Sequence, residues 1–156
     1  MSTKAAGSRW PGVALAVIVF ATAVAVLLEV KDPRAQDVTV YMSPHCGCCG
    51  EWVDHLANNG FSARKHLVDN LDVVKARQQV PTAVASCHTA VVDGYFVEGH
   101  VPAADIRRLL GQRPSARGLA APGMPAGAPG MESAGREPYD VLLVDEEGRT
   151  TVFAKH

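Results

Sequence analysis

Three of the four cysteines in this chain of 156 residues fall within four positions, as Cys46-Gly47-Cys48-Cys49. Cys46 and Cys49 form a Cys-x-x-Cys pair, which suits either a redox-active disulfide or two metal ligands. The third thiol, Cys48, is a disadvantage in a simple redox enzyme because it allows mixed pairings. Three thiolates in one loop therefore favour a soft metal ion, Cu(I) or Zn(II). A disulfide beside one free buried cysteine is the alternative.

The residues around this cluster predict a strand before it and a helix after it. The run Val38–Met42 is β-branched and aromatic, and Ser43-Pro44 ends it. After Cys49, apolar residues recur at helical spacing as far as Ala57, and Gly60 is a typical helix stop. The cysteines thus occupy a helix N-terminus, where free backbone N–H groups and the helix dipole favour thiolate, the form that binds metal or attacks a disulfide.

The chain beyond this helix predicts a small α/β domain. A strand, a helix capped by Asp69 or Asn70, a third strand, a hairpin and a last helix are expected at 61–68, 69–77, 82–86, 90–97 and 104–111. The order β-α-β-α-β-β-α, with Cys-x-x-Cys at the first strand–helix junction and Val80-Pro81 before the third strand, resembles the thioredoxin-like fold. This resemblance implies that Pro81 follows a cis bond and faces the thiols.

Cys87 and His88 follow the predicted third strand and form a second cluster of metal-binding residue types. On a thioredoxin-like domain this stretch can approach the first cysteine loop, so we expect all four cysteines to converge. His100, shortly before a helix that starts with proline, is a further candidate ligand on the same side. The alternatives are a buried strand cysteine at position 87 and ordinary loop histidines at positions 88 and 100.

A Pro/Gly-rich loop is predicted at residues 112–137, which have no periodic apolar face. Met124 and Met131 lie in it. A thioether is a Cu(I) ligand, so the loop could carry a methionine-bearing flap over the site. The alternative is that both methionines only attach the loop to the domain. Beyond the loop, residues 139–144 and 150–154 predict a C-terminal β-hairpin.

The N-terminal part of the chain indicates the compartment. A basic segment at 1–12 precedes an apolar segment at 13–30, and a linker at 31–37 follows. The apolar run is longer than a usual signal-peptide core and slightly short for a membrane span, so we expect a signal anchor or a signal peptide and favour the anchor. The single domain at 38–156 is then extracytoplasmic. The balance of 15 basic and 16 acidic residues argues against a nucleic-acid partner.

An ordered set of motifs also resembles one protein family. The motifs are Ser43-Pro44, Cys46-Gly47-Cys48-Cys49, Trp52, His55-Leu56, Val80-Pro81, Ser86-Cys87-His88-Thr89, Gly94-Tyr95, Glu98-Gly99-His100-Val101-Pro102, Gly118-Leu119 and Pro122-Gly123-Met124-Pro125. From Val38 to His156 the chain is similar to the domain of unknown function 411 family, bacterial exported proteins described as metal-binding and linked to copper handling. The resemblance implies a ligand set of the four cysteines with His88 and His100. His45 departs from the family pattern and could add a ligand or tune the first thiol.

These features together predict a metal-binding protein at the periplasmic face of a bacterial inner membrane. The expected ion is Cu(I), with Zn(II) second, and the expected role is metal sequestration, delivery or resistance. Its expected partners are the metal ion, other periplasmic copper-handling proteins and the membrane, through the N-terminal segment. An enzyme is the less favoured class, and its form is a thiol-disulfide oxidoreductase that uses Cys46 and Cys49. Cys48 separates the two, because Cys-x-x-Cys redox chemistry does not need it.

Overall fold

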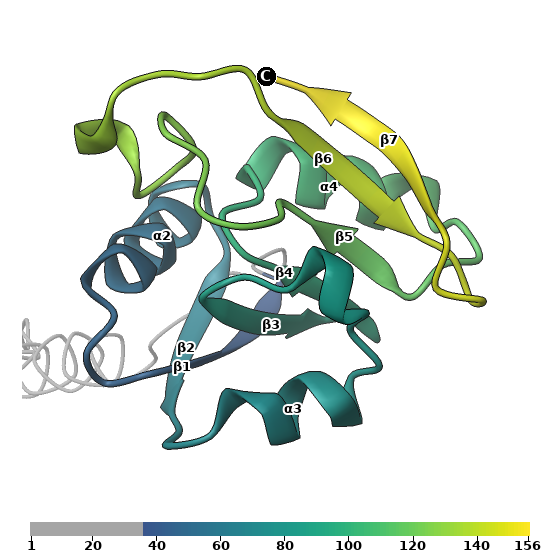
Figure 1. Cartoon of the computed structure of the whole chain (residues 1–156), viewed down its shortest axis with the longest axis horizontal. Coiled ribbons are helices and arrows are strands. Elements are labelled where there is room, and N and C mark those ends of the chain that lie inside the picture. Colours follow the sequence, from purple (N-terminus) through teal and green to yellow (C-terminus); the bar gives the residue numbers. More distant parts are fainter. Residues whose placement is uncertain (1–35) are drawn as a thin grey trace, which may run out of the picture. The chain divides into compact units, whose positions relative to one another are not determined.

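A seven-stranded sheet organises residues 36–156, the part of the chain that the computed structural model describes (Figure 1). The expected basic segment 1–12, the signal anchor or signal peptide 13–30 and nearly all of the linker 31–37 lie outside the described residues. No helix within residues 36–156 is both long enough and apolar enough to cross a membrane. The elements are β1 (Asp37–Met42), α2 (Gly47–Asn58), β2 (Ser62–Leu67), α3 (Leu71–Arg77), the 3₁₀ turn η1 (Thr82–Val84), β3 (His88–Val92), β4 (Tyr95–Glu98), α4 (Ala103–Gln112), β5 (Gly118–Ala120), the 3₁₀ turn η2 (Glu132–Ala134), β6 (Asp140–Val144) and β7 (Thr150–Lys155).

The strands of the sheet follow the order β2-β1-β3-β4-β5-β6-β7. β1 pairs in parallel with β2 and β4 pairs in parallel with β5, whereas the other neighbours are antiparallel. In this register Met42, the last residue of β1, is level with both Leu67 of β2 and His88 of β3. The end of β1, the start of β3 and the cysteine loop that follows β1 therefore share one end of the sheet.

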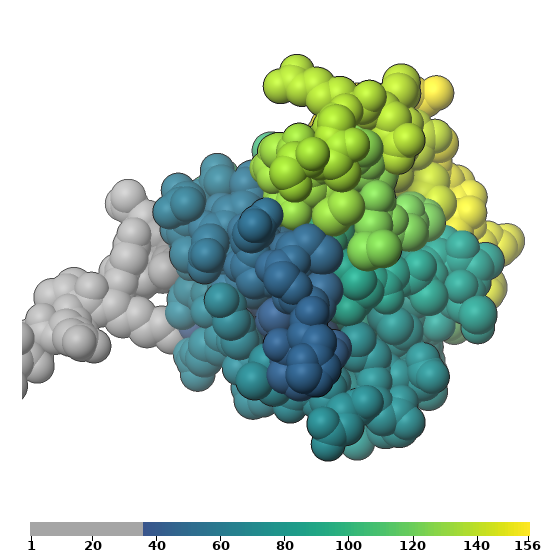
Figure 2. Space-filling model, turned by 60° about the vertical axis from the view of Figure 1, so that its left-hand side comes forward, coloured from purple at the N-terminus to yellow at the C-terminus, as the bar shows by residue number. Residues whose placement is uncertain are grey.

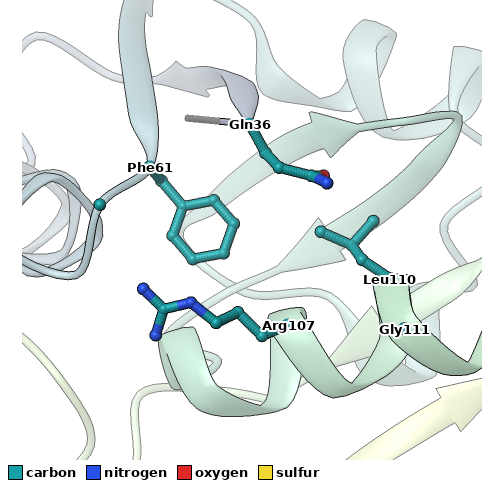
Figure 3. Close-up of a pocket in the computed structure, with 6 residues that line it drawn as sticks. Gln36, Phe61, Arg107, Leu110 and Gly111 are labelled. Carbon is teal, nitrogen blue, oxygen red and sulfur yellow. The ribbon is translucent and has the colours of Figure 1, made fainter. Parts of the chain in front are cut away.

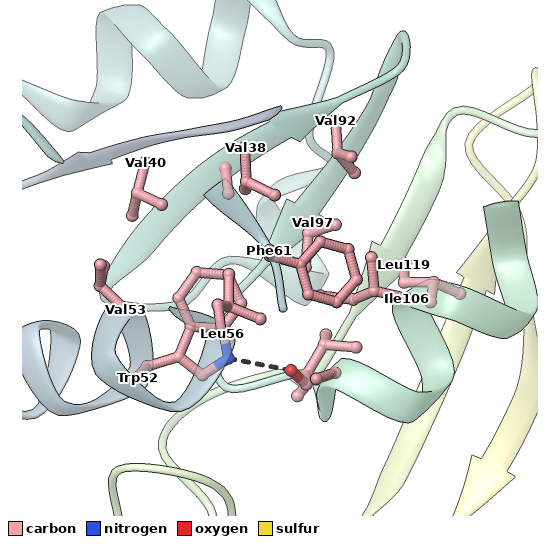
Figure 4. Packing of buried hydrophobic residues seen from close by; sticks show 14 of the residues in the cluster. Val38, Val40, Trp52, Val53, Leu56, Phe61, Val92, Val97, Ile106 and Leu119 are labelled. Carbon is pink, nitrogen blue, oxygen red and sulfur yellow. Dashed lines mark hydrogen bonds between the residues drawn. The ribbon is translucent and has the colours of Figure 1, made fainter. Parts of the chain in front are cut away.

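One face of the sheet packs against α2 and α4 and forms the hydrophobic core (Figure 4). Alternate residues of a strand point to the same side, so Val38, Val40 and Met42 of β1 all face these helices. Trp52 of α2 is fully buried, and its indole N–H donates to the carbonyl oxygen of Val101 at 2.9 Å. This bond satisfies the polar atom of a large core side chain and fixes α2 against the segment that leads into α4.

The opposite face of the sheet carries α3, which contacts β1 and β3. The helix is capped at one of the two residues predicted, because the Asn70 side chain accepts a hydrogen bond from the Asp72 amide at 2.9 Å. None of the residues of α3 is fully buried. Lys75 ties the helix to the sheet, since its ammonium group donates to Thr89 of β3 and to Glu98 of β4.

The strand predicted at Thr82–Ser86 is wrong. Pro81 instead precedes the 3₁₀ turn η1, in which the Val84 amide donates to the Pro81 carbonyl oxygen at 3.0 Å. After the turn, the Ser86 amide bonds to the side chain of Glu98 and not to a neighbouring strand. The cis bond expected before Pro81 is also wrong, because no peptide bond within residues 36–156 is cis.

The hairpin, the last helix and the C-terminal strands are present close to their predicted places. The hairpin of β3 and β4 turns at Asp93-Gly94, where both residues have positive φ, 47° and 87°, as a two-residue type I′ turn requires. Pro102 directly precedes α4. The C-terminal hairpin is formed by β6 and β7, with an irregularity between Val141 and Leu142.

The Pro/Gly-rich loop predicted at 112–137 contains a strand that we did not predict. Gly118–Ala120 form β5, which pairs with β4 and β6 and so joins the C-terminal hairpin to the rest of the sheet. A Cβ at Gly118 would lie 2.0 Å from the carbonyl oxygen of Phe96, so only glycine permits this close approach. The following residues, 121–138, leave the sheet and pass above α2 in the view of Figure 1.

Candidate metal centre

The cysteine loop joins β1 to α2, as the sequence predicts. Cys46 is the N-cap residue of α2, and the first turn of the helix carries Cys48 and Cys49. A disulfide bond joins Cys46 to Cys49, and the Sγ of Cys48 lies 3.5 Å from the Sγ of Cys46. Gly47 is exposed, and the segment that contains the loop lies on the surface (Figure 2). The last side chain of the loop, that of Cys49, is fully buried.

A second group of ligand atoms comes from the ends of two central strands. Cys87 precedes β3, His88 is the first residue of β3, and His100 lies two residues beyond β4. Continued pairing of the two strands brings them together, because the Gly99 amide donates to the His88 carbonyl oxygen at 3.1 Å. The Sγ of Cys87 is 3.3 Å from the Nδ1 of His88 and 3.2 Å from the Nε2 of His100. Both imidazoles are fully buried.

These two arms of the site meet at Cys87. Its sulfur and the three sulfurs of the cysteine loop all lie within 4.8 Å of one another, and so do its sulfur and one nitrogen each of His88 and His100. The structure therefore brings together all six residues predicted as principal ligands. Thiolate sulfur and neutral imidazole are the ligands that Cu(I) and Zn(II) prefer. Either group could hold such an ion, once the Cys46–Cys49 disulfide is reduced in the first.

A hydrogen bond from His100 to the Pro/Gly-rich loop determines which nitrogen of the ring is free. The Nδ1 of His100 lies 2.7 Å from the carbonyl oxygen of Pro129. A carbonyl oxygen can only accept, so Nδ1 carries the proton and Nε2 keeps its lone pair. The lone pair faces the sulfur of Cys87, as in metal-binding histidines that are held by an outer partner. Burial lowers the pKa of His100 and so favours the neutral ring that binds metal.

Cys87 and His88 are both held in their uncharged forms. Burial raises the pKa of the Cys87 thiol to about 11, and burial also lowers the pKa of His88 to about 3. A metal ion that binds Cys87 must displace the thiol proton, so binding is linked to pH. The Nε2 of His88 is buried without a hydrogen-bond partner, and the His88 ring lies 4.4 Å from the ring of Trp52. An unpaired buried nitrogen costs free energy, which packing of the core alone does not explain.

The Pro/Gly-rich loop borders the site. Gly130 has a φ of +81° and lies against the first turn of α2, where an added Cβ would be 2.8 Å from the Cys48 carbonyl oxygen and from the Trp52 amide nitrogen. Nearer the start of the loop, the Gly123 carbonyl oxygen accepts a hydrogen bond from the Ser86 hydroxyl. The loop therefore contacts both arms of the site. Figure 2 shows it beside the surface segment that contains the cysteines.

The two methionines of the loop follow these two glycines. Met124 comes after Gly123 and is 56% exposed, and Met131 comes after Gly130 and is half-buried. Each methionine is therefore one residue away from a contact with one arm of the site. The loop is present beside the site, and a flap whose thioethers bind the metal stays a prediction.

Two further predicted site residues lie outside the two ligand groups. His45 is exposed in the turn before α2 and belongs to neither group. Pro81 lies beside the turn between β6 and β7, where a Cβ added at Gly148 would be 3.7 Å from its Cγ. The position expected for Pro81, against the thiols, depended on a third strand at 82–86 that the structure does not contain.

We did not predict a buried ionic network beside the second arm. Glu98 is fully buried, and its carboxylate accepts hydrogen bonds from Lys75, Ser86 and Thr89. Burial raises the pKa of Glu98, and these hydrogen bonds oppose the shift. The available signal was an acidic residue inside a strand, two positions before His100, because such a residue needs a buried partner.

Two hollows of the domain surface contain no cysteine. One of about 350 Å³ is lined by residues that include Gln36, Phe61 and Arg107, with the guanidinium group of Arg107 over the Phe61 ring (Figure 3). A larger one of about 620 Å³ is lined by residues of the Pro/Gly-rich loop and the C-terminal hairpin, among them Pro129 and Tyr139. Neither of these two hollows is lined by any of the six ligand residues.

Comparison with known proteins agrees with the motifs in the sequence. The model of a family described as protein of unknown function, DUF411, matches residues 84–131. Two solved structures described as copper resistance protein CopG, form 1 and form 2, are each 44% identical to this chain, with a TM-score of 0.75. These matches cover 79% of this chain and 98% and 99% of the two solved chains. None of the curated proteins matches the chain. The identity over nearly the whole of a solved relative, together with the family match, shows that this chain belongs to the DUF411 family.

Proposed function

We propose that this protein binds Cu(I) through the thiolates of its four cysteines and the imidazoles of His88 and His100. The observation that carries the proposal is the shared position of Cys87, whose sulfur belongs to both groups of ligand atoms within 4.8 Å. A sulfur between three other sulfurs and two imidazole nitrogens is a site for a soft cation. The solved relatives are described as copper resistance proteins, which supports the same ion.

Copper is preferred to zinc on the chemistry of the surroundings. Cu(I) takes thiolate and thioether ligands, and the loop beside the site supplies Met124 and Met131 as further donors. Zinc requires four ligands at tetrahedral positions, commonly in a closed structural site. The cysteine loop lies at the surface, with Cys46 and Cys48 half-buried, so it does not have the closed surroundings of such a site, although sulfur and imidazole suit both ions. Zn(II) is the second candidate.

Metal binding by all four cysteines begins from the reduced protein. Opening the Cys46–Cys49 disulfide takes two electrons from a dithiol or phosphine reductant, together with two protons, and yields two thiols. A dithiol supplies the two protons itself, whereas with a phosphine they come from water, whose oxygen ends in the phosphine oxide. Each thiol that becomes a ligand then releases its proton to solvent as the metal binds. The amides at the N-terminus of α2 favour the thiolates of the cysteine loop in this step.

The role and place of the protein follow from the same proposal. An extracytoplasmic domain, held at a bacterial inner membrane by the apolar N-terminal segment or released from it by cleavage, would sequester or deliver copper in the periplasm and contribute to resistance. Other copper-handling proteins of that compartment are its proposed partners. The fold is proposed to be thioredoxin-like, on the basis of β1, α2 and β2 followed by the β3–β4 hairpin and α4.

One observation speaks for thiol-disulfide exchange as an alternative. The disulfide joins Cys46 to Cys49, the two cysteines that such an enzyme would use. The alternative gives no role to Cys48, to Cys87 or to the two buried histidines, and the relatives are described by copper resistance and not by redox activity. Metal binding uses all of these groups, so it is the favoured function.

A competition experiment on the full chain separates the two functions. The phosphine-reduced protein should retain Cu(I) against the chromophoric chelator bicinchoninate, and it should reduce a model disulfide negligibly. Replacement Cys48→Ser should weaken Cu(I) binding by at least about tenfold, because it removes a ligand, and should leave any Cys46/Cys49 exchange unchanged. Loss of Cu(I) to the chelator together with rapid disulfide reduction would overturn the proposal. If the protein retains Zn(II) more tightly than Cu(I), the proposed ion is wrong and Zn(II) takes its place in the proposal.

A further inference from the structure

The buried network of Glu98 fills both oxygens of a carboxylate that has no access to solvent. The Oε1 of Glu98 accepts from the Ser86 amide at 2.6 Å and from the Lys75 ammonium group. Its Oε2 accepts from the Thr89 hydroxyl at 2.6 Å, and Lys75 donates to the same hydroxyl oxygen at 3.1 Å. The Lys75 side chain is only 13% exposed and that of Glu98 is 0% exposed. Both oxygens of the carboxylate are thus satisfied by partners within the protein.

The partners of Glu98 flank two of the proposed metal ligands in the chain. Ser86 directly precedes Cys87, and Thr89 directly follows His88, so one carboxylate holds both sides of the Cys87-His88 pair. The Ser86 amide lies between η1 and β3, where no strand offers it a carbonyl partner. Glu98 supplies that partner from the neighbouring strand.

The same residue is part of the segment that carries the other histidine. Glu98 ends β4, and its main-chain carbonyl oxygen accepts from the Ala121 amide at 2.9 Å. Gly99 then bonds to the His88 carbonyl oxygen, and His100 follows with its Nε2 3.2 Å from the Cys87 sulfur. The side chain of Glu98 thus connects the strand of His100 to the segment of Cys87.

Stability alone is a weak reason for such a network. A buried ion pair commonly stabilises a fold no better than apolar side chains of similar volume. Apolar side chains, however, cannot hold an amide and a hydroxyl at fixed directions from one point. The network also lies on the α3 face of the sheet, behind His88, which faces Trp52 on the other side. It can therefore orient the ligands without competing for the metal.

We propose that Glu98, with Lys75 and Thr89, is a positioning device that holds Cys87 and His100 in ligand geometry before the metal arrives. This inference deepens the proposed function, and the part of it that concerns metal affinity rests on that function. Lys75 compensates the carboxylate charge next to a site that collects thiolates, and Thr89 completes the second oxygen. Groups that orient metal ligands from outside typically contribute about 10- to 100-fold to metal affinity.

The first test needs no metal. In the full chain with Cys46→Ser, Cys48→Ser and Cys49→Ser, Cys87 is the only remaining thiol, and its rate of alkylation by iodoacetamide is measured. Adding Thr89→Val removes the hydroxyl at nearly constant volume and should raise the rate by at least about threefold, since the released segment opens more often. Thr89→Ser keeps the hydroxyl and should leave the rate close to that of the background.

The second test measures Cu(I) affinity in the chain with all four cysteines, again against bicinchoninate. Glu98→Gln and Thr89→Val should each lower the Cu(I) affinity by about tenfold or more. The separate variant Thr89→Ser keeps the hydroxyl group and should bind Cu(I) as tightly as the unmodified chain. Val144→Ala, in the separate cluster around Phe96, is the control for lost stability and should lower the melting temperature without lowering the affinity. Lys65→Met, which breaks the exposed pair with Asp54, is the control for lost charge.

The outcomes of the two tests distinguish the positioning role of Glu98 from the proposed binding of Cu(I). Glu98→Gln, added to the same triple-serine background, should raise the alkylation rate as Thr89→Val does. Unchanged alkylation in both variants overturns the positioning role, whether or not the chain binds copper. Faster alkylation with unchanged Cu(I) affinity also overturns it, because the geometry would then not matter for binding. Faster alkylation in a chain whose unmodified form does not retain Cu(I) supports the positioning of Cys87 and rejects the proposed function alone.

Discussion

The two arms of the candidate centre are built in opposite ways. The cysteine loop is continuous in sequence, begins a helix, lies on the surface and contains the disulfide between Cys46 and Cys49. The second arm is assembled from the ends of β3 and β4, and its two histidines are fully buried. Its neighbours hold it through the Pro129 carbonyl oxygen and the Glu98 carboxylate.

This difference indicates that the second arm is preformed for metal binding, whereas the number of ligands in the cysteine loop can change. The second arm is held in one geometry by three hydrogen bonds, two to Glu98 of β4 and one to Pro129 of the loop, so it loses little conformational freedom when a metal binds. The cysteine loop has no side-chain cap on its helix and can exist as disulfide or as thiols, so its ligand number can change. Cys87 connects the two arms, because its sulfur belongs to both groups.

The largest expected effect is therefore at Cys87. Replacement Cys87→Ser removes the shared ligand and should lower Cu(I) affinity by more than about 100-fold, beyond what outer residues contribute. Cys46→Ser removes one sulfur from the cysteine loop only and should cost about tenfold. Both are measured by chelator competition on the reduced full chain. Equal losses in the two variants would contradict the central place of Cys87.

The contact between the Pro/Gly-rich loop and the cysteine loop can be broken at Gly130. In Gly130→Ala the new Cβ meets backbone atoms of Cys48 and Trp52 at 2.8 Å, in a left-handed conformation that itself costs about 1–2 kcal/mol. We expect the free energy of unfolding to fall by more than about 2 kcal/mol in a denaturant titration of the metal-free protein.

Gly123→Ala is the matched control for this substitution. Gly123 also has a positive φ, +70°, but an added Cβ there meets no atom within 4 Å, so only the same conformational cost of about 1–2 kcal/mol remains. A Gly130→Ala protein as stable as the Gly123→Ala protein would show that the loop does not press against the first turn of α2.

The contrast between the arms also explains what the sequence could predict. The cysteine loop is local, and the strand before it and the helix after it have clear periodic patterns, so both its composition and its place at a helix N-terminus were predictable. The second arm depends on pairing between β3 and β4. The Asp93-Gly94 turn made that hairpin predictable, but the contact of Cys87 with His100 at 3.2 Å came only as an expectation from the fold.

The errors have physical reasons as well. Thr82–Ser86 has strand-forming residues, yet Pro81 starts a 3₁₀ turn there and Glu98 takes the Ser86 amide, a tertiary contact that no local pattern contains. The strand β5 is only three residues long and starts at Gly118, a residue that usually weakens strands, so its pairing with β4 was not visible. The Lys75–Glu98 pair joins residues 23 positions apart and was likewise hidden.

A smaller effect is expected at His55, which links the helix of the first arm to the segment of the second. The Nε2 of His55 accepts a hydrogen bond from the Ala103 amide at 3.1 Å, and burial lowers its pKa. A lowered pKa means that the unfolded chain takes up the proton first, so this contribution is present above pH about 6.5 and is lost as the pH falls below it.

The variant His55→Gln isolates this contribution because it keeps an acceptor but cannot titrate. Between pH 7.5 and pH 5.5 the free energy of unfolding of the metal-free variant should fall less than that of the unmodified protein. The difference between the two proteins should be below about 1 kcal/mol, since solvent screens a partly exposed ring. Thermal unfolding at both pH values measures the difference. The same pH dependence in both proteins would mean that His55 does not make this pH-dependent contribution to stability.

The smallest expected effect marks where the cysteine arm ends. His45 is adjacent to Cys46 in sequence but is exposed and belongs to neither ligand group. His45→Ser should change Cu(I) affinity by less than about threefold, the range of an ordinary surface substitution. His66→Ser, at another exposed histidine, is the control. A tenfold loss in His45→Ser alone would place His45 among the ligands, and the surface arm would then gather its ligands as the metal binds, in contrast to the preformed arm at Cys87.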